Sequence, residues 1–407
     1  MTRPDAIVPL AASPSGAASE AEGMKAPEGP PAGAAWAARF GGSQVVGGPG
    51  SLAAMGELGR RLGGRRALLV TDPGVRAAGH AARGEQALRE AGLEVALFDG
   101  VEENPTTRHV EAGTAFAREL RIDLIAAVGG GSAMDCAKGI NFLLTNGGRM
   151  EDYWGTGLAA RPMLPSIAAP TTAGTGSEAQ CYALIEQEGT RRKMACGDEK
   201  ARFAAVVLDP DLTATCPRRV RALTGMDAIS HAVESLVSLR GSLLSEALSR
   251  EAWRLLSGSF ARVLEGSDEV VRQRMLVGAH LAGAAVEASM LGAAHAAANP
   301  LTSRFQIPHG AAVLLMLPHV VRYNAAVVAA RYDELAAEVV SGGAGGLAGW
   351  LESARTLAGL PERLSECGVA RTDLPSLAAD AACQWTGRFN PRPATSADFE
   401  RLYDAAW

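Results

Sequence analysis

The 407-residue sequence lacks the features that mark several classes of protein. Its six cysteines are scattered and include no CxxC pair, which argues against a disulfide framework. No uninterrupted apolar run approaches the roughly 18 residues that a membrane span requires. The N-terminus has no basic segment followed by an apolar one, so no secretory signal is predicted. These absences predict a cytoplasmic protein with reduced thiols and no membrane partner.

Charge of one sign is not concentrated anywhere along the chain. Lys and Arg number 39 against 44 Asp and Glu, a formal net charge of −5, and the two signs are interspersed. A basic stripe of the kind that attracts nucleic acid or anionic lipid is therefore missing. The sequence predicts no nucleic-acid partner, and its 47% hydrophobic content is typical of a globular protein.

The length predicts two domains, because 407 residues exceed the ~250–300 at which single hydrophobic cores usually divide. Residues 1–35 are rich in Ala, Pro, Gly and Ser and almost devoid of large hydrophobes, so we expect a disordered tail there. Residues 36–217 form the expected α/β domain and residues 218–407 the expected helical domain.

Short apolar runs alternate with helical patterns in the first domain. Strands are expected at 66–71, 93–98 and 122–128, and helices at 80–91 and 107–119. This alternation indicates βαβ units and a parallel sheet covered on both faces, which binds ligands beyond the carboxyl ends of its strands. Helical periodicity prevails after residue 217.

Three of the seven histidines and one aspartate, all in the second domain, form a candidate metal site. Asp227 and His231 stand at i and i+4 among apolar residues, so they share an interior face of one helix. His295 is flanked by small residues, and His309 lies in a Pro-His-Gly turn. A buried Asp–His pair and satisfied core histidines would explain each feature singly. As a group, one carboxylate and three imidazoles suit Fe(II) or Zn(II) with a position left open for substrate.

The first domain offers an anion site. Gly129-Gly-Gly-Ser132 ends a strand and opens a helix, where backbone N–H groups and the helix N-terminus attract phosphate, although an ordinary strand-to-helix turn has the same pattern. The segment 170–178 carries four hydroxyls and two glycines, typical of a loop that binds a polar cofactor, or of a Ser/Thr turn. Asp72 ends the first clear strand and could accept hydrogen bonds from a ribose or cap a helix.

These segments resemble, in this order, the iron-containing (group III) alcohol dehydrogenase family, from about residue 40 to the C-terminus. The motifs that carry the resemblance are Thr71-Asp72, Glu103-Asn-Pro-Thr106, Gly129-Gly-Gly-Ser-Ala-Met-Asp135 with Lys138, Pro170 to Glu178, Asp209-Pro-Asp-Leu212, Gly225-Met-Asp-Ala228 with His231, and Pro308-His-Gly310. Each piece is short, and the combination is specific.

The resemblance implies a Rossmann-like dinucleotide domain with a parallel sheet, followed by an all-α metal-binding domain, the dehydroquinate synthase-like architecture. It implies a small alcohol or aldehyde substrate, NAD rather than NADP, a divalent metal with Fe(II) preferred to Zn(II), and a homodimer. The implied metal ligands, which act in catalysis through the metal, are Asp227, His231, His295 and His309. The implied NAD contacts are Asp72, Asn104, Gly130, Gly131, Ser132, Asp135, Thr171, Thr172, Thr175, Lys193 and Leu212.

The sequence departs from the family pattern near the expected substrate pocket. The family often has a second histidine four residues after the position of His295, where this chain has Asn299, and an amide cannot shuttle protons at neutral pH. Gln180 and Tyr182 stand where the family often has Thr and Asn. These three residues are expected to line the pocket, and they predict an unusual substrate.

The activity implied by the resemblance is metal-dependent, NAD(H)-linked interconversion of an alcohol and an aldehyde or ketone. The cation would act as a Lewis acid, and hydride would pass to or from nicotinamide C4. Two alternatives are an enzyme like dehydroquinate synthase or glycerol-phosphate dehydrogenase, and a catalytically weakened homologue that binds NAD and metal. The first handles phosphorylated substrates with basic residues near the metal, and no Lys/Arg cluster surrounds His295 or His309 in the sequence.

Overall fold

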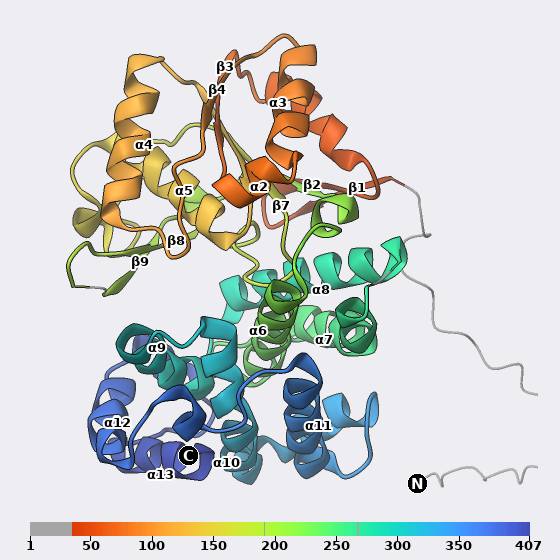
Figure 1. Ribbon diagram of the computed structural model, residues 1–407, viewed down its shortest axis with the longest axis vertical. Helices are drawn as coiled ribbons and strands as arrows, with labels where there is room; N and C mark the ends of the chain where they lie inside the picture. Colours follow the sequence, from red (N-terminus) through yellow and green to blue (C-terminus); the bar gives the residue numbers. More distant parts are fainter. Residues whose placement is uncertain (1–34, 191, 267) are drawn as a thin grey trace, which may run out of the picture. The chain divides into compact units, whose positions relative to one another are not determined.

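The computed structural model describes residues 35–190, 192–266 and 268–407. The predicted tail, residues 1–35, lies outside the described residues except for its last position. A sheet-bearing lobe comes first in the chain, and every helix from residue 218 onward belongs to a second, helical lobe (Figure 1). The two lobes belong to one compact unit.

A seven-stranded sheet forms the centre of the first lobe, in the order β1-β2-β10-β7-β5-β3-β4. Its neighbouring strands run parallel except for β1 and β2. The strands are β1 (Trp36–Phe40), β2 (Ser43–Gly47), β3 (Arg66–Val70), β4 (Glu94–Phe98), β5 (Leu124–Gly129), β7 (Ser166–Pro170) and β10 (Ala205–Leu208). The predicted strands at 66–71, 93–98 and 122–128 are confirmed as β3, β4 and β5.

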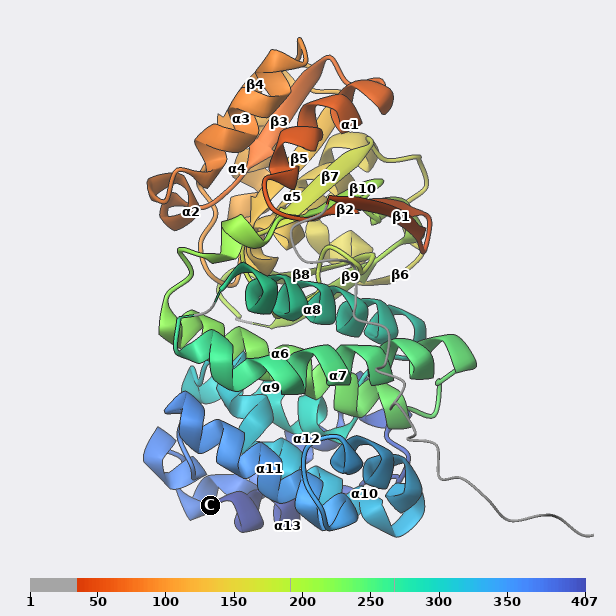
Figure 2. The same ribbon diagram turned by 90° about the vertical axis from the view of Figure 1, so that its right-hand side faces the viewer.

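The central strand β5 shows why both faces of the sheet are covered. All six of its residues are buried, and successive side chains point to opposite faces. Leu124 joins a core with α1 (Met55–Arg61) and α3 (His80–Glu90) on one face. Ile125 joins a core with α4 (Thr107–Glu119) and α5 (Gly131–Asn146) on the other. The predicted helices at 80–91 and 107–119 are thus confirmed as α3 and α4, and Figure 2 shows helices on both sides of the sheet.

A smaller sheet, which the sequence analysis did not anticipate, lies at the edge of this lobe that faces α9 in Figure 1. Its order is β6-β9-β8, with β8 and β9 forming an antiparallel hairpin. The strands are β6 (Gly155–Thr156), β8 (Tyr182–Glu186) and β9 (Lys193–Gly197). Alternate residues of β8, Ala183 and Ile185, are buried in the same core as α5, so the hairpin is fixed to the lobe.

The helical lobe is built around one large core of aliphatic and small side chains. Its helices are α6 (Arg218–Val237), α7 (Leu243–Leu264), α8 (Glu269–Ser289), α9 (Ala293–Phe305), α10 (His309–Ala337), α11 (Gly343–Ala358), α12 (Leu374–Ala382) and α13 (Ser396–Ala406). The short helices of the chain are α2 (Pro73–Ala77), η1 (Ser51–Ala54), η2 (Met150–Tyr153), η3 (Glu199–Ala201), η4 (Pro210–Thr213), η5 (Leu364–Cys367), η6 (Arg371–Asp373) and η7 (Trp385–Phe389).

Helix α10 is long and apolar enough to cross a bilayer by length and composition alone. Most of its apolar window, 61%, is buried inside the protein, as expected of a core helix. Its hydropathy reflects packing on all sides, because neighbouring residues such as Val313, Leu314 and Leu315 are all fully buried. We therefore assign α10 to the core of the helical lobe.

Backbone contact joins the two lobes at α8. A Cβ atom built on Gly283 would lie 2.6 Å from the Cα of Gly176, and Gly176 has a φ of 62°. Beside this contact, Glu287 of α8 forms an ion pair of 2.8 Å with Arg202 and accepts a hydrogen bond from the Cys181 N–H. Glycine at both positions lets the 170–178 segment touch α8 directly.

Alanine at position 283 is expected to destabilise the protein although alanine usually favours a helix. The new methyl would meet the backbone of Gly176, and overpacking of this kind costs about 1–3 kcal/mol. Gly258 in α7 has nothing within 4 Å of its Cβ position, so Gly258→Ala should instead stabilise by up to about 1 kcal/mol. Denaturant unfolding of the two variants should give changes of opposite sign; equal signs would contradict the contact.

Candidate metal centre and cofactor site

One carboxylate oxygen lies among three imidazoles in the helical lobe. Asp227 Oδ1 is 3.7 Å from His231 Nε2, 3.7 Å from His295 Nε2 and 3.9 Å from His309 Nε2. Asp227 and His231 come from successive turns of α6, His295 from α9, and His309 from the first residue of α10. The structure therefore brings together all four residues that the sequence analysis selected as metal ligands.

The spacing of these atoms suits a shared cation better than direct hydrogen bonds. Two atoms that are each about 2.1 Å from one metal ion lie at most about 4.2 Å apart. The candidate ligand atoms of Asp227, His295 and His309 all lie within 4.8 Å of one another, so a small contraction would complete the shell. His231 is outside this mutual set, but its ring stacks on that of His295 with centroids 5.1 Å apart.

Buried polar atoms without partners mark the same point. Asp227 Oδ1 and His295 Nε2 are buried and accept or donate no hydrogen bond among the residues that the structure describes. Unpaired buried acceptors of this kind are destabilising unless a ligand satisfies them. A divalent cation fits both atoms, because carboxylate oxygen and imidazole nitrogen are its ordinary ligands.

Protonation in the cluster is set by burial and by mutual charge. Burial opposes ionisation of Asp227, but the imidazoles around it, His231 first, hold the pKa of this carboxyl well below its usual range. Burial lowers the pKa of His309 to about 3. Burial also disfavours a charged His295, yet the nearby carboxylates of Asp227 and Glu234 raise its pKa to about 9. Asp227 is thus ionised and His309 neutral at pH 7, the states that metal ligation requires.

Glu234 is a buried partner of this cluster that the sequence analysis did not select. Its Oε2 lies 2.6 Å from His295 Nδ1, and its Oε1 accepts a hydrogen bond of 2.7 Å from the Ala294 N–H. A carboxylate on Nδ1 fixes the tautomer so that Nε2 points at the metal position. The signal was present in the sequence, since Glu234 follows His231 by three residues on one helix face.

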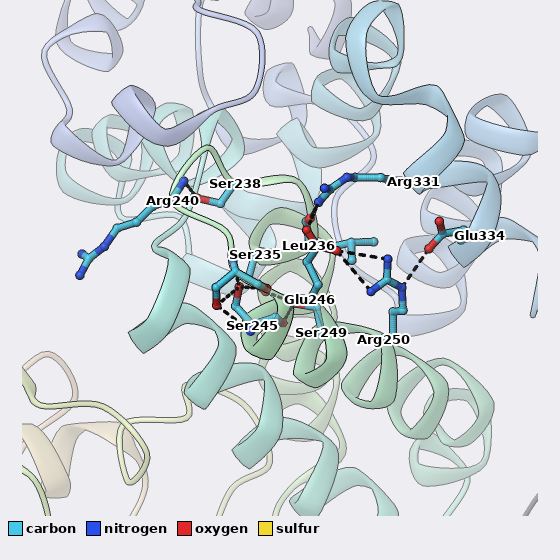
Figure 3. Close-up of polar contacts among 11 residues, drawn as sticks. Ser235, Leu236, Ser238, Arg240, Ser245, Glu246, Ser249, Arg250, Arg331 and Glu334 are labelled. Carbon is cyan, nitrogen blue, oxygen red and sulfur yellow. Dashed lines mark hydrogen bonds and ion pairs between the residues drawn. The ribbon is translucent and has the colours of Figure 1, made fainter. Parts of the chain in front are cut away.

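Polar contacts at the end of α6 hold the helix that carries Asp227 and His231 (Figure 3). Arg331 of α10 donates to the Leu236 carbonyl at 2.7 Å and forms an ion pair of 2.7 Å with Glu246 of α7. Arg250 of α7 bridges Glu246 and Glu334. These contacts tie the C-terminal end of α6 to α7 and α10.

The glycine turn and the hydroxyl-rich loop lie against each other in the sheet-bearing lobe. Strand β5 ends at Gly129, and α5 begins at Gly131 with no side-chain cap on its first turn. Cβ atoms built on Gly130 and Gly131 would lie 3.4 Å from Thr172 Oγ1 and 2.7 Å from Thr175 Oγ1. Backbone N–H groups and hydroxyls thus converge at a helix N-terminus, an arrangement that suits a pyrophosphate.

Three predicted cofactor residues from distant segments meet beside this turn. Asn104 donates its backbone N–H to Ser132 Oγ at 3.3 Å, and its side-chain oxygen accepts from Lys193 Nζ at 3.1 Å. Asn104 has a φ of 54°, a conformation that asparagine tolerates better than most residues. Burial is the main cause of the low pKa of His309, and the charge of Lys193 lowers it further.

Asp72 caps helix α2, which is one of the two roles that the sequence predicts for it; the other is a ribose contact. Its Oδ1 accepts a hydrogen bond of 2.9 Å from the Val75 N–H. Its Oδ2 lies 3.5 Å from the Cβ position of Gly129, so the second oxygen faces the glycine turn. The capping role is confirmed, and a ribose contact by the remaining oxygen stays a prediction.

The remaining predicted cofactor residues lie deeper. Thr171, Asp135 and Leu212 are each at most 6% exposed. Asp135 is 3.9 Å from Lys138 Nζ, and Lys138 donates to the carbonyls of Ser177 and Tyr182 at 2.7 Å each. These contacts brace the hydroxyl-rich loop, and direct contact of the three residues with NAD stays a prediction.

The predicted pocket residues are distributed over both lobes. Gln180 donates to the Thr175 carbonyl at 2.9 Å. The Tyr182 ring stacks on Trp385, with centroids 6.1 Å apart. Asn299 donates to Gln384 Oε1 at 3.1 Å. Asn299 is therefore hydrogen-bonded to another amide. The histidine that the family often has at this position would instead offer a titratable group.

The hydroxyl-rich loop also contacts the helix that carries the metal cluster. A Cβ atom built on Gly174 would lie 2.4 Å from the Cβ of Thr224, one turn before Asp227 on α6. The Gly174 backbone is close enough to His231 to act on its pKa, although burial has the larger effect and lowers it. The metal cluster and the predicted cofactor loop are therefore adjacent.

Comparison with known proteins supports one family along the whole folded chain. A family model described as iron-containing alcohol dehydrogenase matches residues 42–210, and one described as the C-terminal part of the Fe-containing alcohol dehydrogenase family matches residues 221–407. The 1,3-propanediol dehydrogenase of Klebsiella pneumoniae is 34% identical over 372 residues, covering 88% of this chain and 96% of that protein.

Solved structures agree with this result. A crystal structure of 1,3-propanediol oxidoreductase matches with a TM-score of 0.86 and 33% identity, covering 89% of this chain and 97% of that one. Sulfoacetaldehyde reductase from Bifidobacterium kashiwanohense in complex with NAD+ matches with a TM-score of 0.82 and 26% identity, covering 89% and 96%. The chain belongs to the iron-containing alcohol dehydrogenase family and is an oxidoreductase of that type.

Proposed function

We propose that the protein interconverts a small alcohol and its aldehyde or ketone, with NAD(H) as hydride partner and a divalent cation held by Asp227, His231, His295 and His309. The observation that carries the proposal is the convergence of three imidazole nitrogens within 3.7–3.9 Å of Asp227 Oδ1. The adjacent glycine turn and hydroxyl-rich loop supply a second, phosphate-binding element.

The residues of the cluster prepare the metal position. Glu234 accepts a hydrogen bond from His295 Nδ1–H, so Nε2 would be the nitrogen that holds the ion. Imidazole ligates a cation only in its neutral form, so His295 would hold the ion as a neutral ring. A divalent cation there supplies Lewis-acid catalysis at the substrate oxygen, and the nicotinamide supplies hydride chemistry. We propose Fe(II) from the family description, while Zn(II) accepts the same ligands.

We infer the side from which substrate approaches the cluster from the solvent exposure of the four ligand side chains. The His309 side chain is 30% exposed, whereas those of Asp227, His231 and His295 are at most 8% exposed. Lys193 and Asn104, which we propose as cofactor contacts, lie together in the lobe that adjoins this cluster. The Asn299 amide cannot take up the substrate proton. We therefore propose that this proton leaves toward solvent on the His309 side of the cluster.

An NADH-depletion assay tests the proposed function. The protein is reconstituted anaerobically with Fe(II) and mixed with short aldehydes and ketones, and net NADH loss is followed by absorbance. Net consumption is expected. Recycling of NAD without net change would instead indicate a lyase of the dehydroquinate synthase type, and binding of NADH and metal without turnover would indicate a weakened homologue. Homodimer formation and a cytoplasmic location remain part of the proposal.

Asp72→Ser is expected to shift cofactor preference toward NADPH. Serine keeps the hydrogen bond to the Val75 N–H, since it caps helices as well as aspartate does. It removes the carboxylate that would repel a 2′-phosphate. The ratio of kcat/KM for NADPH over NADH should rise at least about 10-fold, equivalent to about 1.4 kcal/mol. An unchanged ratio in a stably folded variant would show that Asp72 acts only as a cap.

A further inference from the structure

The first turn of α9 has no cap from its own segment. Its N-cap residue is Gly292, which has no side chain to accept the free N–H groups at the start of the helix. Two buried side chains from distant segments accept them: Asn390 Oδ1 accepts from the Ala293 N–H at 3.2 Å, and Glu234 Oε1 accepts from the following N–H at 2.7 Å. His295, a candidate metal ligand, comes next in the sequence. The start of the helix that carries this ligand is therefore fixed from outside α9.

The turn that leads into α9 has a strained backbone. Helices α8 and α9 are bent by 104° at the break between them. Met290, which lies in this break, has φ 65° and ψ 177°, a conformation that is almost restricted to glycine. Such a conformation persists only where surrounding contacts hold it. Ser238, at the end of α6, donates to the Ser289 carbonyl on one side of the turn, and Asn390 holds the first turn of α9 on the other.

The amide of Asn390 can take only one orientation. Its Nδ2 donates to Asn324 Oδ1 at 2.7 Å and to the Arg392 carbonyl at 2.6 Å. Asn324 Nδ2 donates in return to Asn390 Oδ1 at 2.9 Å. Both asparagines are only 1% exposed, so a flipped amide would leave buried polar groups unpaired. The Asn390 oxygen therefore faces the Ala293 N–H.

Asn390 also connects the three helices that carry the candidate metal ligands. Asn324 belongs to α10, and Ala293 is the first residue of α9. Phe389, the residue before Asn390, accepts a hydrogen bond of 2.8 Å at its carbonyl from the Leu239 N–H, just beyond the end of α6. Because α6, α9 and α10 supply all four candidate ligands, the contacts of Asn390 act on the positions of these ligands relative to one another.

We propose that Asn390 is a positioning residue of the metal site, whose amide caps α9 from the C-terminal segment and holds His295 in place opposite Asp227. The separation that it maintains is the 3.7 Å between His295 Nε2 and Asp227 Oδ1. Asn390 acts through the backbone of α9, whereas Glu234 also bonds the imidazole ring of His295. This inference rests on the proposed metal-dependent function.

Asn390→Ala tests the inference, with Asn141→Ala as its matched control. Asn141 of α5 is also a buried asparagine, 2% exposed, that pairs with the backbone of a distant segment. It donates to the Leu164 carbonyl at 2.9 Å and accepts from the Leu164 N–H at 3.0 Å. Both variants should lose stability, because each leaves a buried N–H without its acceptor. They differ in that only Asn390 holds a helix that carries a metal ligand.

Co(II) is the probe of the metal site, because its visible absorption spectrum depends on the geometry of its ligands. Affinity is measured by competition with a chelator, and folding by circular dichroism. Asn390→Ala should lower Co(II) affinity about 10-fold or more and change the spectrum of the bound ion. Asn141→Ala should change neither, although it destabilises the fold. NADH binding should be retained in both variants.

Asn324→Ala is the second variant, for the case that Asn390→Ala does not fold. It leaves Asn390 in place but removes the amide that orients it. The Co(II) affinity should fall in the same direction by a smaller factor, and the spectrum should change. An affinity and a spectrum equal to those of the wild type in this folded variant would overturn the inference.

The outcomes separate this inference from the proposed function. If the wild-type protein binds Co(II) and a folded Asn390→Ala variant keeps both the affinity and the spectrum, Asn390 has no positioning role and the metal site stands. If the wild-type protein binds neither Co(II) nor Fe(II), the proposed metal-dependent function is wrong and the inference falls with it.

Discussion

Replacing Asp227 by alanine is expected to empty the metal site and abolish turnover. The variant removes the single carboxylate that all three imidazoles face and leaves only neutral donors. Changes in the residues behind a metal ligand already lower affinity or activity about 10–100-fold, so loss of the ligand itself should lower kcat/KM by more than about 100-fold. Metal content per chain, measured after reconstitution with Fe(II), and NADH oxidation are the two readouts.

Asp227→Asn provides the control for folding. The amide has the volume of the carboxylate and can still accept a hydrogen bond, but it carries no charge. This variant should fold and should bind NADH at the glycine turn of α5, because no predicted cofactor residue is changed. We expect it to retain little metal and little activity. Full activity in protein shown to contain no metal would contradict the proposed metal-dependent mechanism.

The parts of the fold that follow local rules could be predicted from the sequence. Strand β5 is an unbroken apolar run, and it enters the glycine turn as expected. Asp227 and His231 were assigned to one helix face from their spacing alone, and α6 carries both. The convergence of His295 and His309 on them required the family resemblance, since no local pattern specifies how α9 and α10 pack against α6.

Elements that depend on contacts between distant segments could not be predicted. The β8–β9 hairpin was missed because its pairing depends on burial against α5, which no local sequence pattern specifies. Trp385 lies in a short 3-10 helix with no periodic pattern. The sequence predicts either a ribose contact or a helix cap for Asp72, because both roles use the same carboxylate. Only the structure shows the cap, a hydrogen bond from the Val75 N–H.

Burial is the property that sequence alone conveys least well at this site. The family resemblance implied that Asp135 contacts NAD, and Lys138 belonged to the same motif after the glycine turn. In the structure both are almost fully buried, and Lys138 donates to two carbonyls of neighbouring segments. A lysine that is buried and hydrogen-bonded to backbone is a structural brace. Asn104, Ser132 and Lys193 converge beside the glycine turn, and the contact of these residues and of Asp135 with NAD stays a prediction.

Glu234→Gln is expected to weaken metal binding even though it is nearly isosteric. The carboxylate accepts two N–H groups, from Ala294 at one oxygen and from His295 Nδ1 at the other. Glutamine has one oxygen, so either orientation of its amide sets an N–H against one of these donors. If the amide N–H faces His295, the ring proton must move to Nε2, the nitrogen that faces the metal. We expect metal affinity to fall about 10–100-fold, measured by competition with a chelator.

Glu246→Gln is the matched control for this change. Glu246 is also a largely buried acid of the helical lobe, and it pairs with Arg331 and Arg250 in the contacts of Figure 3. Its loss should reduce the free energy of unfolding without changing metal affinity, since its partners are arginines. Glu234→Gln, in contrast, should reduce metal affinity and retain NADH binding. Equal metal affinities in the two variants would mean that Glu234 only stabilises the fold. A residue that orients the His295 ring must change metal affinity when it is replaced.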